Sequence, residues 1–340
     1  MAYLYNRAWI KLESYFQQKQ LGRQGRTSWI NSFPSTPTVF DYLKLDSQLE
    51  LSNDTQAIRA MTILDPDYPS LLREIKDPPS VLYLLGRDLN YEEKLTVSLI
   101  GSRHPTPYGE KVANMVVKYF AHPEVTIISG MAVGIDSIAQ KAALKVGMNS
   151  IAVLGSGVDI CYPKSQYRLY KDLVCQGSIV SEFPPGTLAK AYHFPLRNRI
   201  ISGLSKRLIV AEAGLKSGTM LTARSALEQG RDVYAVPGSI FMQQSQGCHQ
   251  LINDGARILM GLEDLAEAVE EHVVNLSPGD KKCLLVIGQF EPDFLSLQNL
   301  LKLETTELLV GLAKLEGMGL INQNNARYRL TDKALRLISA

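Results

Sequence analysis

Three short motifs of small and hydroxyl-bearing residues each stand between an apolar run and a candidate helix. They are Gly101-Ser102-Arg103, Ser129-Gly130 and Ser217-Gly218-Thr219. Each can present backbone N–H groups and a hydroxyl to an anion at the start of a helix. Any one of them alone is more typical of an ordinary helix cap or turn. Three of them at one edge of a sheet favour a surface that binds phosphate groups.

Basic residues gather in one stretch of the chain. Residues 183–211 contain no acidic side chain, and they include Lys190, Arg197, Arg199, Lys206 and Arg207. Arg197 and Arg199 flank Asn198 among apolar residues, so their guanidinium groups need a phosphate or carboxylate partner. The alternative to a bound phosphate is a structural ion pair, with Glu182 or Glu212 as the partner.

Net charge alone does not predict a nucleic-acid-binding protein. The 340 residues carry 36 Lys and Arg against 34 Asp and Glu, a formal net charge of +2. Any binding to a polyanion must therefore depend on a local concentration of positive charge. Besides the stretch above, Lys164 supplies a cation directly after Tyr162-Pro163, in another loop that follows a predicted strand.

Motifs of several enzyme classes are absent from the sequence. Gly155-Ser156-Gly157 lacks the third glycine of a dinucleotide fingerprint, and neither a P-loop nor a GxSxG elbow occurs. The histidines show no metal-binding spacing, and we expect neither a metal nor another cofactor. The four cysteines form no CxxC pair, which favours reduced thiols in a cytoplasmic protein.

A sheet must position the motifs. The apolar runs TVSLIG, VTIISG, IAVLG, SIVSEF, RLIVAEA and DVYAVPG predict strands, each followed by a loop and a candidate helix. Continuous apolar strands that alternate with helices indicate an α/β fold, in which helices cover both faces of a mostly parallel sheet. Right-handed crossovers then place the loops after the strands at one edge, where ligands of such sheets bind.

Two further regions flank the predicted sheet. Residues 1–60 are polar and weakly periodic, and they predict a small helical N-terminal domain, whereas residues 261–273 predict an amphipathic helix that closes the core. Residues 281–340 predict three short helices and a hairpin, which is typical of a winged-helix module. Its candidate recognition helix, TTELLVGLAKLEGMG, has no arginine, which favours protein interaction over duplex binding.

No run of 18 apolar residues and no secretion signal occur, so we expect no membrane contact.

Seven motifs in order resemble the DprA/Smf family of DNA-processing proteins. They are GSRHPTPYG, SGMAVGID, AVLGSGVDICYP, SEFPPGT, FPLRNRIISGLS, SGTMLTARSALEQGRDVYAVPG and GCHQLINDGA. The resemblance implies an extended Rossmann-like core, residues 61–273, that binds single-stranded DNA and dimerises, and a DML1-like C-terminal winged helix. It also implies protection of incoming DNA and its delivery to RecA recombinase during natural transformation, without covalent chemistry.

The resemblance also implies roles for individual residues. Arg103 of the GSR motif and Lys164 after the YP dipeptide match DNA-contacting cations of the family, and Arg197-Asn198-Arg199 matches its RNR motif. The chain departs from the usual family residues Arg, His and Asn at three positions, which are Val133, Gln140 and Gln166. The missing positive charge at Val133 predicts a weaker DNA site.

Two functions remain open from the residues. The first is a recombination mediator that binds single-stranded DNA, with phosphates on the loops at 101–103, 129–130 and 217–219. The second is an enzyme that binds or hydrolyses a nucleotide, in which Glu212 or Asp136 acts as general base.

Residues 233–258 hold more apolar side chains than one strand and one helix need. This excess predicts either a self-association face or ordinary core packing.

Overall fold

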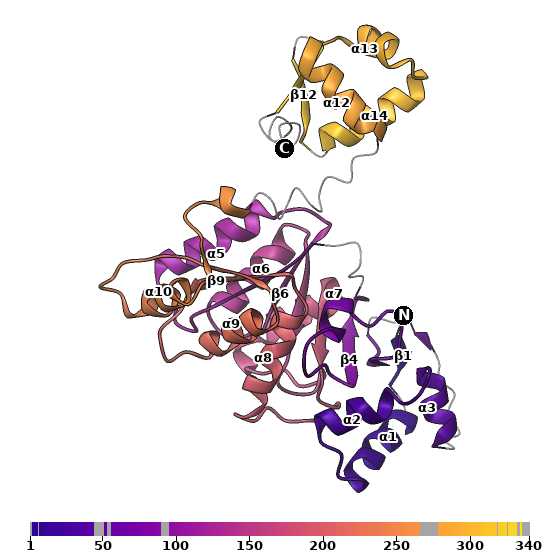
Figure 1. The fold of residues 1–340 in the computed structure, drawn as a ribbon, viewed down its shortest axis with the longest axis vertical. Helices are drawn as coiled ribbons and strands as arrows, with labels where there is room; N and C mark the ends of the chain where they lie inside the picture. Colours follow the sequence, from indigo (N-terminus) through magenta and orange to yellow (C-terminus); the bar gives the residue numbers. More distant parts are fainter. Residues whose placement is uncertain are drawn as a thin grey trace. The chain divides into compact units, whose positions relative to one another are not determined.

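The structure is a computed structural model that describes residues 2–5, 7–43, 51–52, 56–89, 95–265, 278–317, 319–324, 326–331 and 334. The chain divides into two compact units, Met1–Ala266 and Glu267–Ala340. Figure 1 shows the first unit in indigo to orange and the second in orange to yellow.

One large sheet organises the first unit. Its strands follow the order β11-β10-β9-β5-β6-β7-β8-β4-β3-β1-β2. Neighbours are parallel from β11 to β8 and antiparallel from β8 to β2. The strands are β1 Ala2–Leu4, β2 Leu51–Ser52, β3 Arg59–Thr62, β4 Val81–Gly86, β5 Leu95–Gly101, β6 Val125–Ser129, β7 Asn149–Val153, β8 Ser178–Ser181, β9 Arg207–Glu212, β10 Asp232–Ala235 and β11 Arg257–Ile258. The mostly parallel sheet of the sequence prediction is confirmed.

Helices cover both faces of this sheet. Those of the core are α4 Ser70–Arg73, α5 Pro107–Tyr119, α6 Ile135–Lys145, α7 Tyr167–Gln176, α8 His193–Gly203, α9 Gly218–Glu228 and α10 Gln246–Asn253, with short 3-10 turns η1 Lys164–Gln166, η2 Gln243–Ser245 and η3 Leu262–Leu265. Helices α5, α6 and α7 pack side by side, whereas α8 packs on α9. The two groups lie on opposite faces because their right-handed crossovers run in opposite directions along the sheet.

The order of the strands reverses at β5. The chain goes from β5 to β6 on one side, and later returns to place β9 on the other side. The loops after β5 and β9 therefore diverge at this point and leave a crevice at the carboxyl edge of the sheet.

The N-terminal region differs from the expected separate helical domain. Helices α1 Arg7–Gln18, α2 Arg23–Ile30 and α3 Thr36–Tyr42 are present, but β1 and β2 extend the large sheet. Trp9, Leu12 and Phe16 of α1 belong to the same hydrophobic cluster as the strands. The predicted boundary at residue 60 thus does not separate two compact units, because the sheet runs through it.

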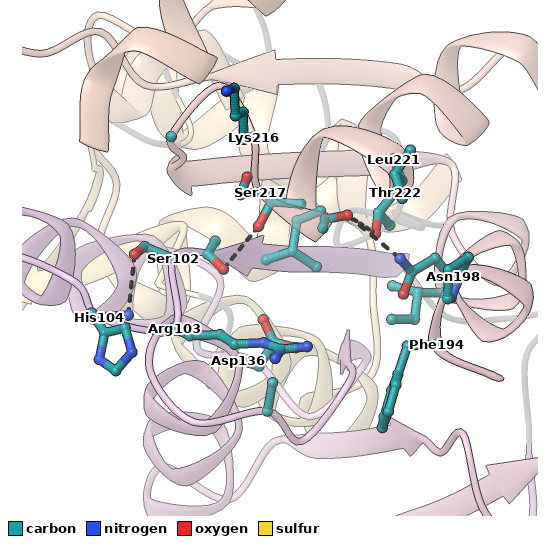
Figure 2. Close-up of a pocket in the computed structure, with 18 of the residues that line it drawn as sticks. Ser102, Arg103, His104, Asp136, Phe194, Asn198, Lys216, Ser217, Leu221 and Thr222 are labelled. Carbon is teal, nitrogen blue, oxygen red and sulfur yellow. Dashed lines mark hydrogen bonds between the residues drawn. The ribbon is translucent and has the colours of Figure 1, made fainter. Parts of the chain in front are cut away.

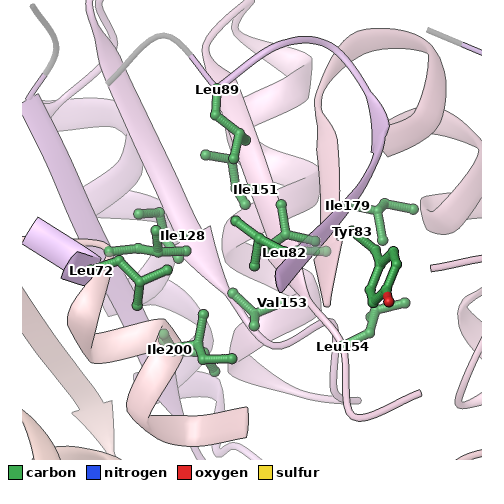
Figure 3. Packing of buried hydrophobic residues seen from close by; sticks show 14 of the residues in the cluster. Leu72, Leu82, Tyr83, Leu89, Ile128, Ile151, Val153, Leu154, Ile179 and Ile200 are labelled. Carbon is green, nitrogen blue, oxygen red and sulfur yellow. The ribbon is translucent and has the colours of Figure 1, made fainter. Parts of the chain in front are cut away.

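The core of the first unit lies on both faces of the central strands. All seven residues of β5 are buried, as its uninterrupted apolar sequence predicts. Figure 3 shows Ile151 and Val153 of β7 packed near Leu82 of β4, and Ile200 of α8 below them. This packing fixes the strand ends, and the loops that follow them, in one rigid frame.

The second unit has its own hydrophobic core. Its elements are α12 Pro278–Phe290, α13 Phe294–Leu301, α14 Thr305–Gly317, β12 Ile321–Asn324 and β13 Arg327–Leu330. Strands β12 and β13 pair antiparallel, and Leu284, Leu297 and Leu312 are buried together. Three helices and a hairpin agree with the predicted winged helix. The predicted helix at 261–273 is described only as far as η3, and its remainder lies outside the described residues.

The helices are short or polar in comparison with a bilayer span. None of the described helices has the length and apolar character to cross a membrane.

Candidate nucleic-acid interface

The loop after β5 is held by hydrogen bonds from three other elements. The Ser102 amide donates to the Glu212 carbonyl oxygen over 2.7 Å, and the Ile135 amide donates to the Ser102 carbonyl oxygen over 3.1 Å. The Thr219 hydroxyl donates to the Gly101 carbonyl oxygen over 2.9 Å. The first and third small-residue motifs therefore meet at one point, as the sequence predicts.

Glu212 fixes the next part of this loop. Its carboxylate is 3% exposed and accepts hydrogen bonds from the Thr106 amide over 2.8 Å and from the Thr106 hydroxyl over 2.6 Å. The Thr106 hydroxyl in turn accepts from the Gly109 amide and caps α5. The carboxylate proposed as a general base is thus occupied in holding the loop and the start of α5.

Buried hydrogen bonds join the ends of β6 and β7 to α8. The Asp136 carboxylate accepts a hydrogen bond from the Gly130 amide over 3.1 Å. The guanidinium of Arg197 donates to the Gly130 carbonyl oxygen over 2.8 Å and also to the Val153 carbonyl oxygen. Burial raises the pKa of Asp136, and the nearby Arg197 partly offsets this rise. Burial lowers the pKa of Arg197 to about 10.

Arg199 points to a different group of residues. Its guanidinium donates to both carboxylate oxygens of Glu182, over 2.9 and 2.6 Å, and to the Asp77 carbonyl oxygen over 2.9 Å. This bidentate pair is the structural alternative that the sequence left open. Carbonyl and carboxylate oxygens accept hydrogen bonds from both arginines of the RNR motif, and their binding to phosphate stays a prediction.

A crevice of about 1160 Å³ lies at the reversal point of the sheet. Most of the predicted site residues line it, and they are Gly101, Ser102, Arg103, Arg197, Asn198, Ser217, Gly218 and Thr219. Figure 2 shows several of these side chains around the opening. The remaining predicted residues, Ser129, Gly130, Lys164 and Arg199, are not among the residues that line the crevice.

Arg199 pairs with Glu182, as described above, and the other three residues lie outside the crevice lining. The Ser129 hydroxyl is buried and donates to the Leu99 carbonyl oxygen over 2.7 Å. Gly130 supports Arg197 through its carbonyl oxygen and Asp136 through its amide. Lys164 is exposed at the start of η1, directly after Tyr162-Pro163, and the Tyr162 ring lines the crevice.

Two exposed cations line the crevice. Arg103 follows β5, and Lys216 precedes α9. Within the part of the chain that the structure describes, neither side chain forms an ion pair. In Figure 2 the Arg103 side chain extends across the opening toward Asp136, while Lys216 stands on the opposite loop. Lys216 was missed in the sequence, although it directly precedes the third motif.

The start of α9 offers hydrogen-bond donors to the same space. Ser217 is the N-cap of α9, but its side chain caps no backbone amide. Its hydroxyl oxygen is buried and has no hydrogen-bond partner among the described residues. The first-turn amides of a helix have no partner within that helix. Ser217 and the amides after it are therefore suited to an anionic ligand.

Two aromatic residues, Tyr162 and Phe194, also line the crevice. Tyr162 is 49% exposed, and its ring centroid lies 5.5 Å from that of Phe194. The Arg197 guanidinium lies 5.9 Å from the Phe194 centroid. Phe194 is thus packed between two neighbours, while Tyr162 retains an exposed surface on which a base can stack.

Metal ligands do not cluster in the described part of the chain. No group of three His, Cys, Asp or Glu side chains there has an arrangement that could hold a metal ion. The crevice offers hydrogen-bond donors and cations instead, which suit an anionic ligand.

Comparisons with known proteins agree on one family. A family model described as DNA recombination-mediator protein A matches residues 59–270. The chain is 40% identical over 236 residues to DNA processing protein DprA of Streptococcus pneumoniae, which covers 69% of this chain and 83% of that protein. It is 42% identical over 205 residues to Protein Smf of Synechocystis, which covers 59% of this chain and 51% of that protein. The match therefore spans about half the length of the Synechocystis relative.

Solved structures give the same result. The X-ray structure of DprA from Streptococcus pneumoniae matches with a TM-score of 0.60 and 37% identity, covering 78% of this chain and 93% of that chain. DNA processing protein A from Helicobacter pylori, whose structure is described in terms of its single-stranded DNA binding mode, matches with a TM-score of 0.57 and 27% identity. That match covers 63% of this chain and 96% of the Helicobacter chain.

Proposed function

Because the chain belongs to the DNA recombination-mediator protein A family, which includes DprA and Smf proteins, we propose that it binds single-stranded DNA. The observation that carries the proposal is the crevice lined by Arg103 and Lys216. Both cations are exposed there, and neither has an ion-pair partner among the described residues. Ser217 at the start of α9 lines the same crevice, and its hydroxyl has no hydrogen-bond partner among the described residues. Phosphate groups are the ligands that such a set of donors recognises.

The shape of the crevice favours a single strand over a duplex. Apolar residues such as Leu215 and Leu221 line it beside the cations, and Tyr162 adds an exposed ring. A flexible strand can place its phosphates at the cations and its bases against these surfaces. A rigid duplex keeps its bases stacked and paired, so it reaches only the rim.

The contacts of the two candidate bases weigh against the nucleotide-hydrolysing alternative. Glu212 accepts two hydrogen bonds from Thr106, and Asp136 accepts one from Gly130 and faces Arg197. Both carboxylates hold loops together at the strand ends. We therefore favour a protein that binds its DNA without covalent chemistry.

Membership of this family supports a wider role. The recombination-mediator description supports delivery of the bound strand to RecA recombinase, with protection of incoming DNA during natural transformation. The action would take place in the cytoplasm, where RecA and the chromosome are, and the protein would act as a homodimer through its Rossmann-like core.

The C-terminal unit supports an accessory role through protein contacts. Helix α14 exposes Leu309 at 51% and Val310 at 70%, and Glu307 lies in its first turn. The Lys314 ammonium is already paired with Asp280 over 2.5 Å. A helix that reads duplex DNA normally presents unpaired basic side chains to the groove.

One purified sample separates the two functions. We expect the protein to bind oligo-dT in a gel-shift titration and to leave nucleoside mono- and triphosphates intact over the same period. Release of a base or phosphate from nucleotides, together with no shift of oligo-dT, would establish the enzyme instead.

A further inference from the structure

One face of α7 carries a row of exposed basic and aromatic side chains outside the crevice. Lys164, Tyr167, Arg168 and Lys171 are all exposed, and we call them the α7 stripe. Their spacing of i, i+3, i+4 and i+7 places them on one side of the helix and of the η1 turn that precedes it. The opposite side is buried, with Leu169, Leu173 and Val174 in the core.

The positive charges of the stripe are not neutralised by neighbours. Lys164, Arg168 and Lys171 form no ion pair within the described ranges of the chain. Asp172 is the one acidic residue of the sequence from 164 to 176, so this segment has a net charge of +2 from three cations and one anion. The stripe therefore presents a local positive potential that favours a polyanion.

Tyr167 gives the stripe an aromatic surface. Its side chain is 54% exposed, and its ring is stacked on that of Tyr170 at a centroid distance of 6.4 Å. The Tyr170 hydroxyl donates to the Val158 carbonyl oxygen over 2.8 Å, which holds the supporting ring in place. The Lys171 ammonium lies 4.9 Å from the Tyr167 centroid. A ring held in this way loses little freedom when a base stacks on it.

The stripe begins where the crevice ends. Tyr162 lines the crevice, and Lys164 stands two residues further on. Helix α7 connects the parallel strands β7 and β8, so its first turn lies at the same carboxyl edge of the sheet as the crevice. The seven steps from Lys164 to Lys171 extend this positive surface by about 10 Å at 1.5 Å per residue.

We propose that the α7 stripe continues the path of single-stranded DNA beyond the crevice, with Arg168 and Lys171 on phosphates and Tyr167 on a base. The inference rests on the proposed function, because it extends the same strand from the same site. Alternating cations and an aromatic ring match the electrostatic and stacking contacts that single-strand-binding surfaces use. A strand long enough to leave the crevice would reach the stripe, whereas a shorter strand would not.

The test compares two lengths of DNA on the full chain. We use oligo-dT of about 5 and of about 15 nucleotides, which are near the limits of known single-strand sites. The variant Arg168→Gln with Lys171→Gln removes two cations. We expect it to weaken binding of the longer oligonucleotide about ten- to thirtyfold near 0.1 M salt, and to reduce the salt slope by about 1.4. Binding of the shorter oligonucleotide should be unchanged.

A matched control removes two exposed lysines elsewhere. Lys118 and Lys145 lie in the last turns of α5 and α6, which end at the opposite edge of the sheet. The variant Lys118→Gln with Lys145→Gln has the same net charge as the test variant and should bind both oligonucleotides normally. In addition, Tyr167→Ala should weaken only the longer complex by about fivefold or more, and Tyr167→Phe should restore it because the ring remains.

Each other result contradicts the inference. Equal affinity and salt slope for the test and control variants on the longer oligonucleotide would exclude the stripe from the DNA path. Equal losses on both lengths would show that the variant disturbs the crevice and not an extension of it. Failure of the unaltered protein to bind either oligonucleotide would overturn the proposed function itself, and this inference with it.

Discussion

Arg103 is the residue on which phosphate binding depends most. It follows β5 directly, its loop is held by hydrogen bonds from β9, α6 and α9, and its side chain is exposed and without an ion-pair partner among the described residues. A guanidinium in such a place can hold a phosphate through two parallel hydrogen bonds. Its removal leaves no buried group unpaired, so its cost should appear in binding and not in folding.

Arg103→Ala should therefore weaken binding of oligo-dT by roughly ten- to a hundredfold. This range corresponds to the loss of a charge-assisted contact of about 1.5–3 kcal/mol. Fluorescence anisotropy gives the affinity, and a thermal melt of the same sample should show an unchanged midpoint. Lys145→Ala, a substitution of an exposed lysine at the end of α6, is the control. An unchanged affinity with a lowered midpoint would mean that Arg103 supports the fold.

Arg197→Met should show the reverse pattern. Arg197 is 5% exposed and donates hydrogen bonds to the Gly130 and Val153 carbonyl oxygens at the ends of β6 and β7, near the buried Asp136 carboxylate. Its loss takes the donor from two buried carbonyl oxygens and the nearby cation from the Asp136 carboxylate, and an unsatisfied buried polar group costs about 1–3 kcal/mol of stability. Urea denaturation should show this loss as a lower midpoint. A variant as stable as the unaltered protein would contradict the structural role assigned to Arg197.

The sequence identified these residue types but not their directions. Arg197 and Arg199 stand two residues apart, on either side of Asn198. They lie inside α8, where two positions differ by about 200° around the axis at 3.6 residues per turn. One guanidinium therefore points to the strand ends and the other to Glu182. The two roles can be told apart only when the start of α8 is known, and composition does not reveal where that helix starts.

At the scale of elements, the approach of the β5 loop to α6 requires a glycine. Gly134 has φ of +91°, and a Cβ built on it would lie 2.2 Å from the Ser102 carbonyl oxygen. That oxygen accepts the Ile135 amide that starts α6. A side chain at this position must therefore displace the loop that carries Arg103.

Gly134→Ala should lower both stability and affinity for oligo-dT, because the loop moves with its arginine. Gly147→Ala is the matched control, since Gly147 also has positive φ, +76°, but a Cβ added there would have no atom within 4 Å. The control should show only the strain of a left-handed residue, about 1–2 kcal/mol, with normal binding. Equal effects of the two substitutions in denaturation and anisotropy would argue against the contact.

The parallel strands β5 to β10 were predictable, whereas the short parallel strand β11 and the antiparallel strands were not. Runs such as TVSLIG are buried on both faces, so they read as continuous apolar segments between helical patterns. Strand β4 has an equally apolar sequence, VLYLLG, but no helix follows it to complete the pattern. Strands β1 and β2 contain three and two residues, which are too few to show a period.

At the scale of the molecule, the stretch 233–258 divides into core and surface. Val236 and Leu251 are buried, whereas Ile240 is 74% and Phe241 is 89% exposed. The sequence could not separate the two groups because both are apolar. Exposed apolar side chains on a surface favour association with another surface.

The unaltered chain should therefore sediment as a dimer at micromolar concentration. Ile240→Ser with Phe241→Ser should raise the dissociation constant by about tenfold or more, because burying one such side chain contributes about 1.5–3 kcal/mol. Sedimentation equilibrium of both proteins measures this. A strictly monomeric unaltered chain would exclude the proposed dimer.

The central claim is that the crevice at the reversal point of the sheet holds a flexible single strand through a few cations. The most direct test is a salt titration of binding to single-stranded and duplex oligonucleotides of equal length. We expect the short single strand to bind about five- to a hundredfold more tightly, as one stacked base contributes about 1–3 kcal/mol. Its slope of log affinity against log salt should be roughly −1.4 to −2.1, for two phosphates at Arg103 and Lys216 and a third at Lys164. Equal affinity for both forms at every salt concentration would contradict the claim.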